Sequence, residues 1–387
     1  MSTPDPTAEP TDTPRRHRAL VLWADPDSPN LGVRVLAQGT AALIHECWNG
    51  ADVVFHNYGM RRSQLPIGSI RGLLWERVSG RRGMQDWLRG FDVIIDTRSG
   101  DSFTDAYGLE RHAVMCLVGI FAAQAGVPVV LGPQTIGPVR GRLARALARA
   151  SLRSASAVFV RDPASRAVAA GLGRREVIET TDVVFALPVP EMAARHDVIL
   201  NVSGLLWEPN THIDSDHYRA VIRALHRRLV AEGRQVSLLA HVLDSGNGDS
   251  DVAVVRALGA ELGAPVIVPS GLDDVRTVLA GSRLVIGSRM HACLNALSVG
   301  TPAVPLGYSD KFAPLLAELG WRHGVDLRDP DVGVAAIMTA IATAEGDSAP
   351  RVVRRALIAR HSAEFALARL ARGRLSRAHV AAALLAR

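Results

Sequence analysis

Residues 284–312 read LVIGSRMHACLNALSVGTPAVPLGYSDKF, and this stretch predicts a strand, a helix and a second strand in immediate succession. The apolar run Leu284–Gly287 is typical of a buried strand, and a small-residue helix follows near 290–299, where Gly300 ends it. The run Pro302–Leu306 predicts the next strand. A strand, helix and strand at this spacing indicate parallel strands in an α/β fold.

The alternation of short apolar runs and helical segments extends over most of the chain. On either side of a joint near residues 187–196, where Pro188 and Pro190 interrupt regular structure, we expect a doubly wound parallel sheet. The two predicted domains are residues 17–190 and 197–345. The predicted strands are Ala19–Trp23, Asp52–His56, Asp92–Asp96, Val127–Leu131 and Ala157–Val160 in the first domain, and Val198–Val202, Gln235–His241, Pro265–Pro269, Leu284–Gly287 and Pro302–Leu306 in the second.

The composition excludes a disordered or disulfide-stapled protein. The chain has 387 residues, of which 48% are hydrophobic and 21% charged, so it can bury large cores. Cys47, Cys116 and Cys293 are far apart and have no CxxC spacing, which is typical of a reducing compartment. Residues 1–16 are rich in Pro and Thr and lack the apolar segment of a signal peptide, so we expect a disordered leader and a cytoplasmic protein.

The net charge of +6 is concentrated at the C-terminus. Residues 351–387 hold nine Arg and one Glu, a charge of +8, so the rest of the chain sums to 6 − 8 = −2. A nearly neutral body does not have the charge of a nucleic-acid-binding protein, and no such partner is expected. Residues 346–387 are predicted as basic amphipathic helices, which either pack on the body or contact an anionic membrane at its inner face.

The uncharged stretch 113–139 is long enough to raise the question of a membrane span. Gln124, Gly126 and Pro128 divide it into a helix and a short strand, and each piece is too short to cross a bilayer, which needs about 20 residues of helix. A buried helix leading into a central strand is the expected structure.

Polar side chains follow two successive strands of the second domain. Arg289 and His291 come after the strand Leu284–Gly287, and Tyr308 and Lys311 come after the next strand. Because the carboxyl ends of parallel strands meet at one edge of a sheet, we expect these side chains in one pocket. The helix that begins there adds free N–H groups and its positive dipole end, which together predict an anion site.

Lys311 is the single lysine among 44 basic residues; the other 43 are Arg. Either a compact ammonium is required at this position, where a planar guanidinium would not serve, or the lysine has survived the bias toward Arg by chance.

Other polar residues are predicted at the same cleft because they also follow strands. Arg161 is one; Asp162 beside it either holds it in an ion pair or caps the helix that begins at Pro163. Gln134 lies in the predicted loop 132–138, which either offers Gln134 and backbone N–H groups to a ligand or only shapes a turn through its Gly and Pro residues. The remaining candidates of this kind are Asn201, Ser203 and His241.

These segments resemble the polysaccharide pyruvyl transferase family. The resemblance rests on SRMHACLNALSVGTPAVPLGYSDKF at 288–312, GPQTIGP at 132–138 and VRDPAS at 160–165, and so covers most of the chain. It implies two Rossmann-like domains whose parallel sheets face a cleft, as in the GT-B fold. It also implies an enzyme that moves the pyruvyl group of phosphoenolpyruvate onto a sugar of a cell-surface polysaccharide, glycolipid or lipid-linked precursor. The product is a ketal, and phosphate is released.

The resemblance gives the pocket residues roles that suit their chemistry. Phosphoenolpyruvate carries a carboxylate and a phosphate; Arg289 suits either group, Lys311 suits the phosphate, and Tyr308 lies between them in sequence. His291 is expected to move protons, because imidazole titrates near neutral pH. Phosphoenolpyruvate is then a co-substrate, and neither a cofactor nor a metal is expected.

The chain departs from the family pattern on the expected acceptor side, where Val33 replaces an acid and Ser99 a glycine. Two alternatives therefore stay open: a sugar-nucleotide glycosyltransferase of the same fold, with Asp273 as a ribose ligand, or a sugar-binding protein that has lost catalysis. Asp249 and Asp251 spell a DxD metal motif, but their place before a helix predicts N-capping instead.

Overall fold

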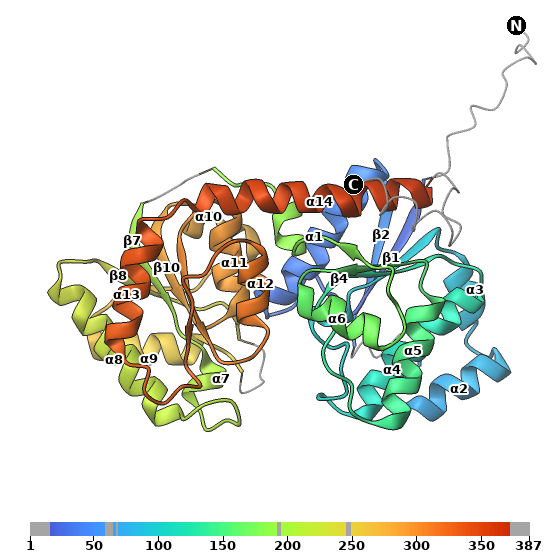
Figure 1. The fold of residues 1–387 in the computed structure, drawn as a ribbon, viewed down its shortest axis with the longest axis horizontal. Coiled ribbons are helices and arrows are strands. Elements are labelled where there is room, and N and C mark those ends of the chain that lie inside the picture. Colours follow the sequence, from blue (N-terminus) through green and yellow to red (C-terminus); the bar gives the residue numbers. More distant parts are fainter. Residues whose placement is uncertain (1–15, 59–64, 67–68, 192–194, 245–248, 372–387) are drawn as a thin grey trace, which may run out of the picture.

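The computed structural model describes residues 16–58, 65–66, 69–191, 195–244 and 249–371. Within these residues the chain forms two six-stranded sheets, each covered by helices, and the two domains lie side by side (Figure 1). The two-domain α/β architecture predicted from the sequence is confirmed. Residues 1–15 of the predicted leader and the end of the predicted basic tail lie outside the described residues.

The first sheet has the strand order β2-β1-β3-β4-β5-β6, and its paired strands are parallel. The direction in which strands are added reverses between β1 and β3, which makes this a topological switch point. Leu22 pairs with both His56 and Asp96, so the three strands end level with one another. The strands are β1 (Arg18–Leu22), β2 (Asp52–His56), β3 (Val93–Asp96), β4 (Val129–Gln134), β5 (Ala157–Val160) and β6 (Ile178–Glu179).

The second sheet has the order β12-β11-β10-β7-β8-β9, again with parallel pairing. Its switch point lies between β7 and β10, where Gly287 pairs with Asn201. This is the strand order of dinucleotide-binding folds. The strands are β7 (His196–Asn201), β8 (Val236–Leu239), β9 (Val266–Ile267), β10 (Ser282–Gly287), β11 (Ala303–Gly307) and β12 (Val325–Asp326).

Helices connect the strands and cover both faces of each sheet (Figure 1). In the first domain they are α1 (Leu31–Cys47), α2 (Ile70–Ser79), α3 (Met84–Arg89), α4 (Leu109–Gln124), α5 (Arg142–Ser154) and α6 (Pro163–Gly171). In the second they are α7 (Gly204–Trp207), α8 (Ser215–Ala231), α9 (Val252–Leu262), α10 (Leu272–Ala280), α11 (Met290–Ser298), α12 (Phe312–Glu318) and α13 (Val334–Glu345).

The predicted strands are all present, and the differences lie at the ends and edges of the sheets. The edge strands β6 and β12 were not predicted, because each is two residues long and carries no apolar run. Strand β4 continues to Gln134, so this residue lies in the sheet and not in the loop expected for it. The uncharged stretch divides into α4 and β4, as predicted. Among the described helices, none combines the length and hydropathy needed to cross a membrane.

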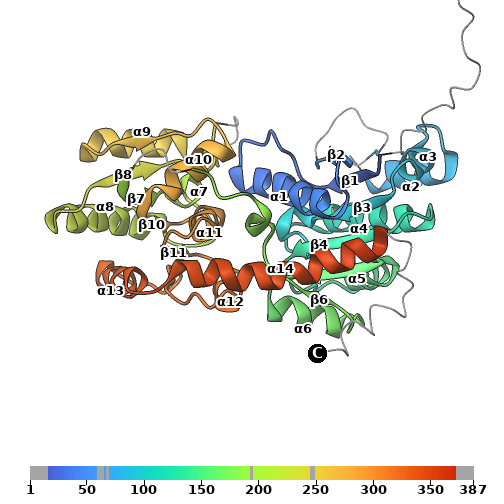
Figure 2. The ribbon, with the colours of Figure 1, turned by 90° about the horizontal axis from the view of Figure 1, so that it is seen from above.

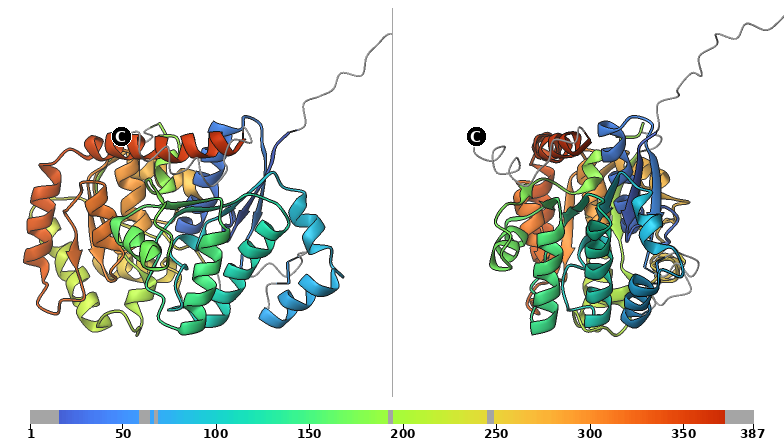
Figure 3. Two further views of the ribbon diagram at one scale, coloured as in Figure 1. Left: turned by 45° about the vertical axis from the view of Figure 1, so that its right-hand side comes forward. Right: turned by 90° about the vertical axis from the view of Figure 1, so that its right-hand side faces the viewer.

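Helix α14 (Ala349–Ala371) runs back from the second domain across the first (Figures 2 and 3). It contacts α11 on one side of the joint and α1 and β6 on the other. The predicted packing of this helix on the body is therefore present. However, some of the large apolar residues of the helix are exposed, and small alanines are buried in their place. Leu357 and Phe365 are 37% and 58% exposed, whereas Ala356 and Ala363 are fully buried.

Candidate functional site

A cavity of about 160 Å³ lies between the two domains, beside the switch point of each sheet. Open α/β sheets bind ligands at such points, outside the carboxyl ends of the strands. The first domain contributes Asn30, Gly32, Val33, Leu36, Ser99, Gly100, Asp101 and Arg161, and the second contributes His241, Arg289, Met290, His291, Tyr308 and Lys311.

Backbone contacts between the domains hold the two rims of the cavity together. The N–H of Leu31, at the start of α1, donates to the carbonyl of His241 at 3.3 Å, and the N–H of Leu243 donates to the carbonyl of Pro29 at 2.8 Å. Asn30 caps α1 by accepting the N–H of Gly32 at 2.9 Å. The N-terminus of α1 is thereby fixed against the loop that follows β8.

In the first domain, residues just after the carboxyl ends of β1 and β3 have unfavourable backbone conformations. Trp23, Arg98 and Ser99 have φ angles of 64°, 47° and 50°, and they are the non-glycine residues with left-handed φ in the described part of the chain. All three follow β1 or β3. Such conformations cost about 1–3 kcal/mol each and concentrate at functional sites, so they mark the same switch point as the cavity does.

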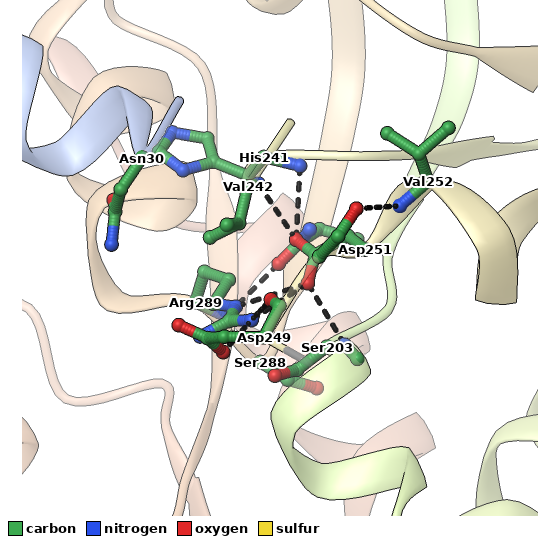
Figure 4. A network of polar contacts seen from close by, with 12 residues as sticks. Asn30, Ser203, His241, Val242, Asp249, Asp251, Val252, Ser288 and Arg289 are labelled. Atoms are coloured by element: carbon green, nitrogen blue, oxygen red, sulfur yellow. Dashed lines mark hydrogen bonds and ion pairs between the residues drawn. The ribbon is translucent and has the colours of Figure 1, made fainter. Parts of the chain in front are cut away.

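Arg289 reaches the cavity but is held by two carboxylates (Figure 4). Its Nε and Nη2 donate to Oδ1 of Asp251 at 3.2 and 2.8 Å, and Nη2 also donates to Oδ1 of Asp249 at 2.6 Å. Burial of the guanidinium opposes its charge, but Asp251 and Asp249 outweigh burial and raise the pKa of Arg289 above its usual range. Nη1 is the guanidinium nitrogen left without a protein acceptor among the described residues.

Asp251 does not cap α9, and the N-capping predicted for it is wrong. Its side chain makes no capping bond and is fully buried. It accepts the N–H groups of Gly204, His241 and Val242 at 2.8, 3.0 and 2.9 Å, in addition to Arg289 (Figure 4). Asp251 therefore ties the loops after β7, β8 and β10 together. The described residues contain no cluster of three or more His, Cys, Asp or Glu that could hold a metal.

We expect Asp251→Asn to lower the free energy of unfolding by about 3–5 kcal/mol, because it leaves the buried Arg289 without its main counter-charge. Asp249→Asn is the matched control. The Asp249 side chain is 41% exposed, so its loss should cost at most about 1 kcal/mol. Denaturant unfolding of both variants measures the difference. Equal losses in the two variants would contradict this account of Asp251.

His291 lies in the first turn of α11 with an uncharged imidazole. Burial is the main cause that lowers the pKa of His291 to about 4; Asp182 opposes this, while Arg161 and Lys311 favour it. The side chain is 15% exposed. At neutral pH the ring therefore has a free lone pair and can accept a proton.

Asp182, which follows β6, is the carboxylate nearest to this ring, with Oδ2 at 3.8 Å from Nε2 of His291. Asp182 is fully buried and forms an ion pair with Arg161. Arg161 also donates to the carbonyl of Gly100 at 3.0 Å and to Oγ1 of Thr135. Of the two predicted roles for Asp162, the structure has the cap: it accepts the N–H of Ser165 at 2.7 Å.

Lys311 lines the cavity and links the two domains. Its Nζ donates to Oδ2 of Asp101 at 2.7 Å. Burial disfavours the ammonium charge, but Asp101 outweighs it, so the pKa of Lys311 is raised and the residue stays charged. Tyr308 lies beside it, with its ring 5.3 Å from that of His212.

The N-terminus of α11 offers two unused donors. The N–H of Arg289 is taken by Oδ1 of Asn201 at 2.9 Å. The N–H groups of Met290 and His291 have no acceptor in the described part of the chain, and both residues line the cavity. These two N–H groups and Lys311 are the donors that the predicted anion site at this helix N-terminus would use, and the site itself stays a prediction.

His241 is buried and neutral. Burial, and then the charges of His291 and Arg289, lower its pKa to about 3. Arg276 donates to Oδ1 of Asn295 at 3.0 Å, so Nδ2 of Asn295 is the donor to Nε2 of His241 at 3.3 Å. Nε2 of His241 is thus an acceptor and does not carry a proton.

Three of the predicted cleft residues, Gln134, Asn201 and Ser203, do not line the cavity. Asn201 is fully buried, and its Nδ2 donates to the carbonyl of Leu239 at 3.0 Å. Gln134 is fully buried in β4, with both side-chain polar atoms unpaired. Ser203 is also buried; its N–H donates to the hydroxyl of Tyr218 at 3.0 Å, beneath the network of Asp251 and Arg289. All three residues lie at or just after strand ends, as predicted, but their side chains are buried inside the domains.

A family model described as polysaccharide pyruvyl transferase matches residues 30–310, which include every residue of the cavity except Lys311. The chain belongs to the polysaccharide pyruvyl transferase family. A related protein is the amylovoran biosynthesis protein AmsJ of Erwinia amylovora, 24% identical over 264 residues. The alignment spans 61% of each chain, so this family member matches somewhat less than two thirds of that relative's length.

Solved structures share the GT-B-like fold of this family member. UDP-GlcNAc 2-epimerase from Methanocaldococcus jannaschii has a TM-score of 0.52 at 11% identity, covering 86% of this chain and 93% of its own. A UDP co-structure of MnaA from S. aureus has a TM-score of 0.53 at 11% identity, covering 92% and 95%. At these identities the likeness establishes the fold alone.

Several residues of the candidate site were not predicted from the sequence. Asp182, Asp101 and Gly32 all come from the first domain and face residues of the second. Asp182 follows a two-residue strand that has no apolar pattern. The weak signal for Asp101 and Gly32 was that both lie in segments where the chain departs from the family pattern, next to Ser99 and Val33.

Proposed function

We propose that this protein transfers the pyruvyl group of phosphoenolpyruvate to a sugar of a cell-surface polysaccharide, glycolipid or lipid-linked precursor, and releases phosphate. The observation that carries the proposal is one small cavity containing a neutral histidine, His291, next to an anion site. That site consists of the free N–H groups at the start of α11 and the ammonium of Lys311.

The size and donors of the cavity support a small anionic donor. Pockets for drug-sized ligands measure about 300–1,000 Å³, whereas this cavity measures about 160 Å³. A phosphate fits the N–H groups of Met290 and His291, which need no rearrangement to bind it. Lys311 can exchange Asp101 for the phosphate, and Nη1 of Arg289 remains available for the carboxylate.

Ketal formation requires proton movements that a neutral histidine can perform. The methylene carbon of phosphoenolpyruvate gains a proton, and C2 then forms a bond to one sugar hydroxyl oxygen. The bond from C2 to the phosphate oxygen breaks, and a second hydroxyl oxygen bonds to C2. Two hydroxyl protons are released; one balances the new methyl group and the other leaves with the phosphate. We assign to His291 the transfer of a hydroxyl proton: the ring accepts it from the sugar and then gives it up to the reacting donor.

We assign binding of the acceptor sugar to the first domain, which lines the cavity opposite the proposed anion site. Helix α14 supports a lipid-linked acceptor, because Ile358 and Phe365 are 62% and 58% exposed on a helix rich in Arg. Such a surface suits peripheral contact with an anionic membrane.

Phosphoenolpyruvate should stabilise the protein, and UDP-sugars should not. A ligand at about a hundredfold its Kd adds about 2.7 kcal/mol to the free energy of unfolding. Thermal shift with phosphoenolpyruvate, inorganic phosphate and a panel of sugar nucleotides measures this, with Lys311→Ala as the control that should lose the shift. Stabilisation by a sugar nucleotide alone would favour a glycosyltransferase instead.

A further inference from the structure

The two nitrogens of the His291 ring have different surroundings. Nε2 is buried without a hydrogen-bond partner and points toward Oδ2 of Asp182, 3.8 Å away. Nδ1 also has no partner among the described residues, but it is not among the buried polar atoms and lies on the side of Gly32, a residue that lines the cavity. One nitrogen therefore faces a carboxylate, and the other faces the space where substrate would lie.

Asp182 is held rigidly in its place. Its carboxylate forms an ion pair with Arg161 and accepts the N–H of Val184 at 3.0 Å. Arg161 is itself fixed by the carbonyl of Gly100 and by Thr135. Because Asp182 is fixed, the His291 ring is the group that would move: a shift of about 1 Å would bring Nε2 within hydrogen-bonding distance of Asp182.

We propose that Asp182 is the positioning residue for His291. It accepts the Nε2–H of the ring, so that Nδ1 carries the lone pair that exchanges a proton with the substrate. The assignment of Nδ1 as the reactive nitrogen rests on the proposed pyruvyl transfer; the orientation of the ring by Asp182 does not.

Of the charged and titratable groups around the ring, Asp182 is the one suited to accept this proton. Arg161, Arg289 and Lys311 have only donors. Asp101 pairs with Lys311 and, unlike Asp182, makes no ion-pair contact with the ring nitrogens, and Nε2 of His241 is engaged by Asn295. A carboxylate behind a histidine fixes the tautomer of the ring and stabilises its charged form as the proton arrives.

Gly32 keeps Nδ1 accessible. A Cβ atom at this position would lie 2.8 Å from Nδ1 and 3.1 Å from Cγ of His291. Contacts below 3.0 Å are not found for real Cβ atoms, so alanine here would displace the ring or cover its nitrogen. The backbone of Gly32 is in the first turn of α1 and has no left-handed φ, so glycine is needed for space and not for conformation.

The proton-transfer unit therefore spans both domains. His291 belongs to the second domain, whereas Asp182 and Gly32 belong to the first. The ring is oriented and left open only when the domains are apposed as they are in this structure. A change in their separation would uncouple the histidine from its carboxylate.

Nitrogen-15 NMR of the histidine rings tests the orientation without substrate. We expect His291, identified by the signal lost in His291→Gln, to be the Nε2–H tautomer and to stay uncharged between about pH 5.5 and 8. Asp182→Asn should change the tautomer ratio. An Nδ1–H tautomer in the wild-type protein would overturn the proposal. This measurement uses the wild-type protein, so it does not depend on whether Asp182→Asn folds.

Gly32→Ala tests the role of Nδ1 in turnover. We expect kcat for phosphate release from phosphoenolpyruvate and acceptor to fall by about 10²-fold, the cost of a misplacement of about 1 Å, with the melting temperature retained. Gly171→Ala is the matched control, because this helical glycine has open space around it. Normal turnover in Gly32→Ala would overturn the assignment of Nδ1. A wild-type protein with the Nε2–H tautomer but no use of phosphoenolpyruvate would instead contradict the proposed function and leave the ring orientation standing.

Discussion

His291→Ala should lower kcat by about 10² to 10⁴ while leaving phosphoenolpyruvate binding largely intact. The side chain acts on protons in the transition state, whereas the anion is bound by backbone N–H groups of α11 and by Lys311. Because the pKa of His291 is about 4, the wild-type ring is uncharged at neutral pH, and alanine removes a base and not a binding charge. Single-turnover phosphate release and calorimetric binding separate the two effects.

His361→Ala is the control for this experiment, since His361 lies on α14 and its side chain is 73% exposed. It should change neither kcat nor binding. If His291→Ala kept full turnover at an unchanged melting temperature, the role of His291 as the proton carrier would be wrong.

Lys311→Arg should lower kcat/KM for phosphoenolpyruvate by about 10²-fold, although the charge is kept. Lys311 is bound to Asp101 through a single contact of 2.7 Å, which a phosphate can replace. A guanidinium would pair with the same carboxylate through two parallel bonds and would be broader than an ammonium. The arginine would therefore stay on Asp101, at a misplaced position for the donor.

Steady-state phosphate release by Lys311→Arg and Lys311→Ala, beside the wild type, measures the effect. Melting temperatures serve as the folding control; Lys311→Arg keeps a positive charge opposite Asp101, so its melting temperature should change little. Near-normal activity of Lys311→Arg would show that the single lysine of the chain is a compositional accident.

The fold was predictable because both sheets are parallel and buried. Strands such as Leu284–Gly287 consist of uninterrupted apolar residues, and the helices between them repeat at their own period. The strands that escaped prediction, Ile178–Glu179 and Val325–Asp326, are edge strands of two residues. Strand β4 ran further than its apolar run, through Gly132 and Pro133 to Gln134, because its pairing with β5 continues past a register shift.

Residues of the site that lie on one sheet edge were also predictable. Arg289, His291, Tyr308 and Lys311 come together because β10 and β11 are neighbouring parallel strands that end at the same level. What each residue binds was not predictable. Asp251, which holds Arg289, lies 38 positions away in sequence and shows only a local capping pattern.

The contribution of the first domain could not be derived from periodicity. The pairing of Asp182 with His291 depends on how two independent sheets are docked, and this is set by the contacts of α1 and α14 with the second domain. The residues that α14 buries include small ones such as Ala356 and Ala363, which carry no distinctive signal in the sequence.

The most direct test of the central claim is the pyruvate ketal content of surface glycans, measured by mass spectrometry in a strain that lacks this protein. The account predicts that the ketal disappears, that the wild-type protein restores it, and that His291→Ala, expressed at the same level, does not. Unchanged ketal content in the deletion strain, or full restoration by His291→Ala, would contradict it.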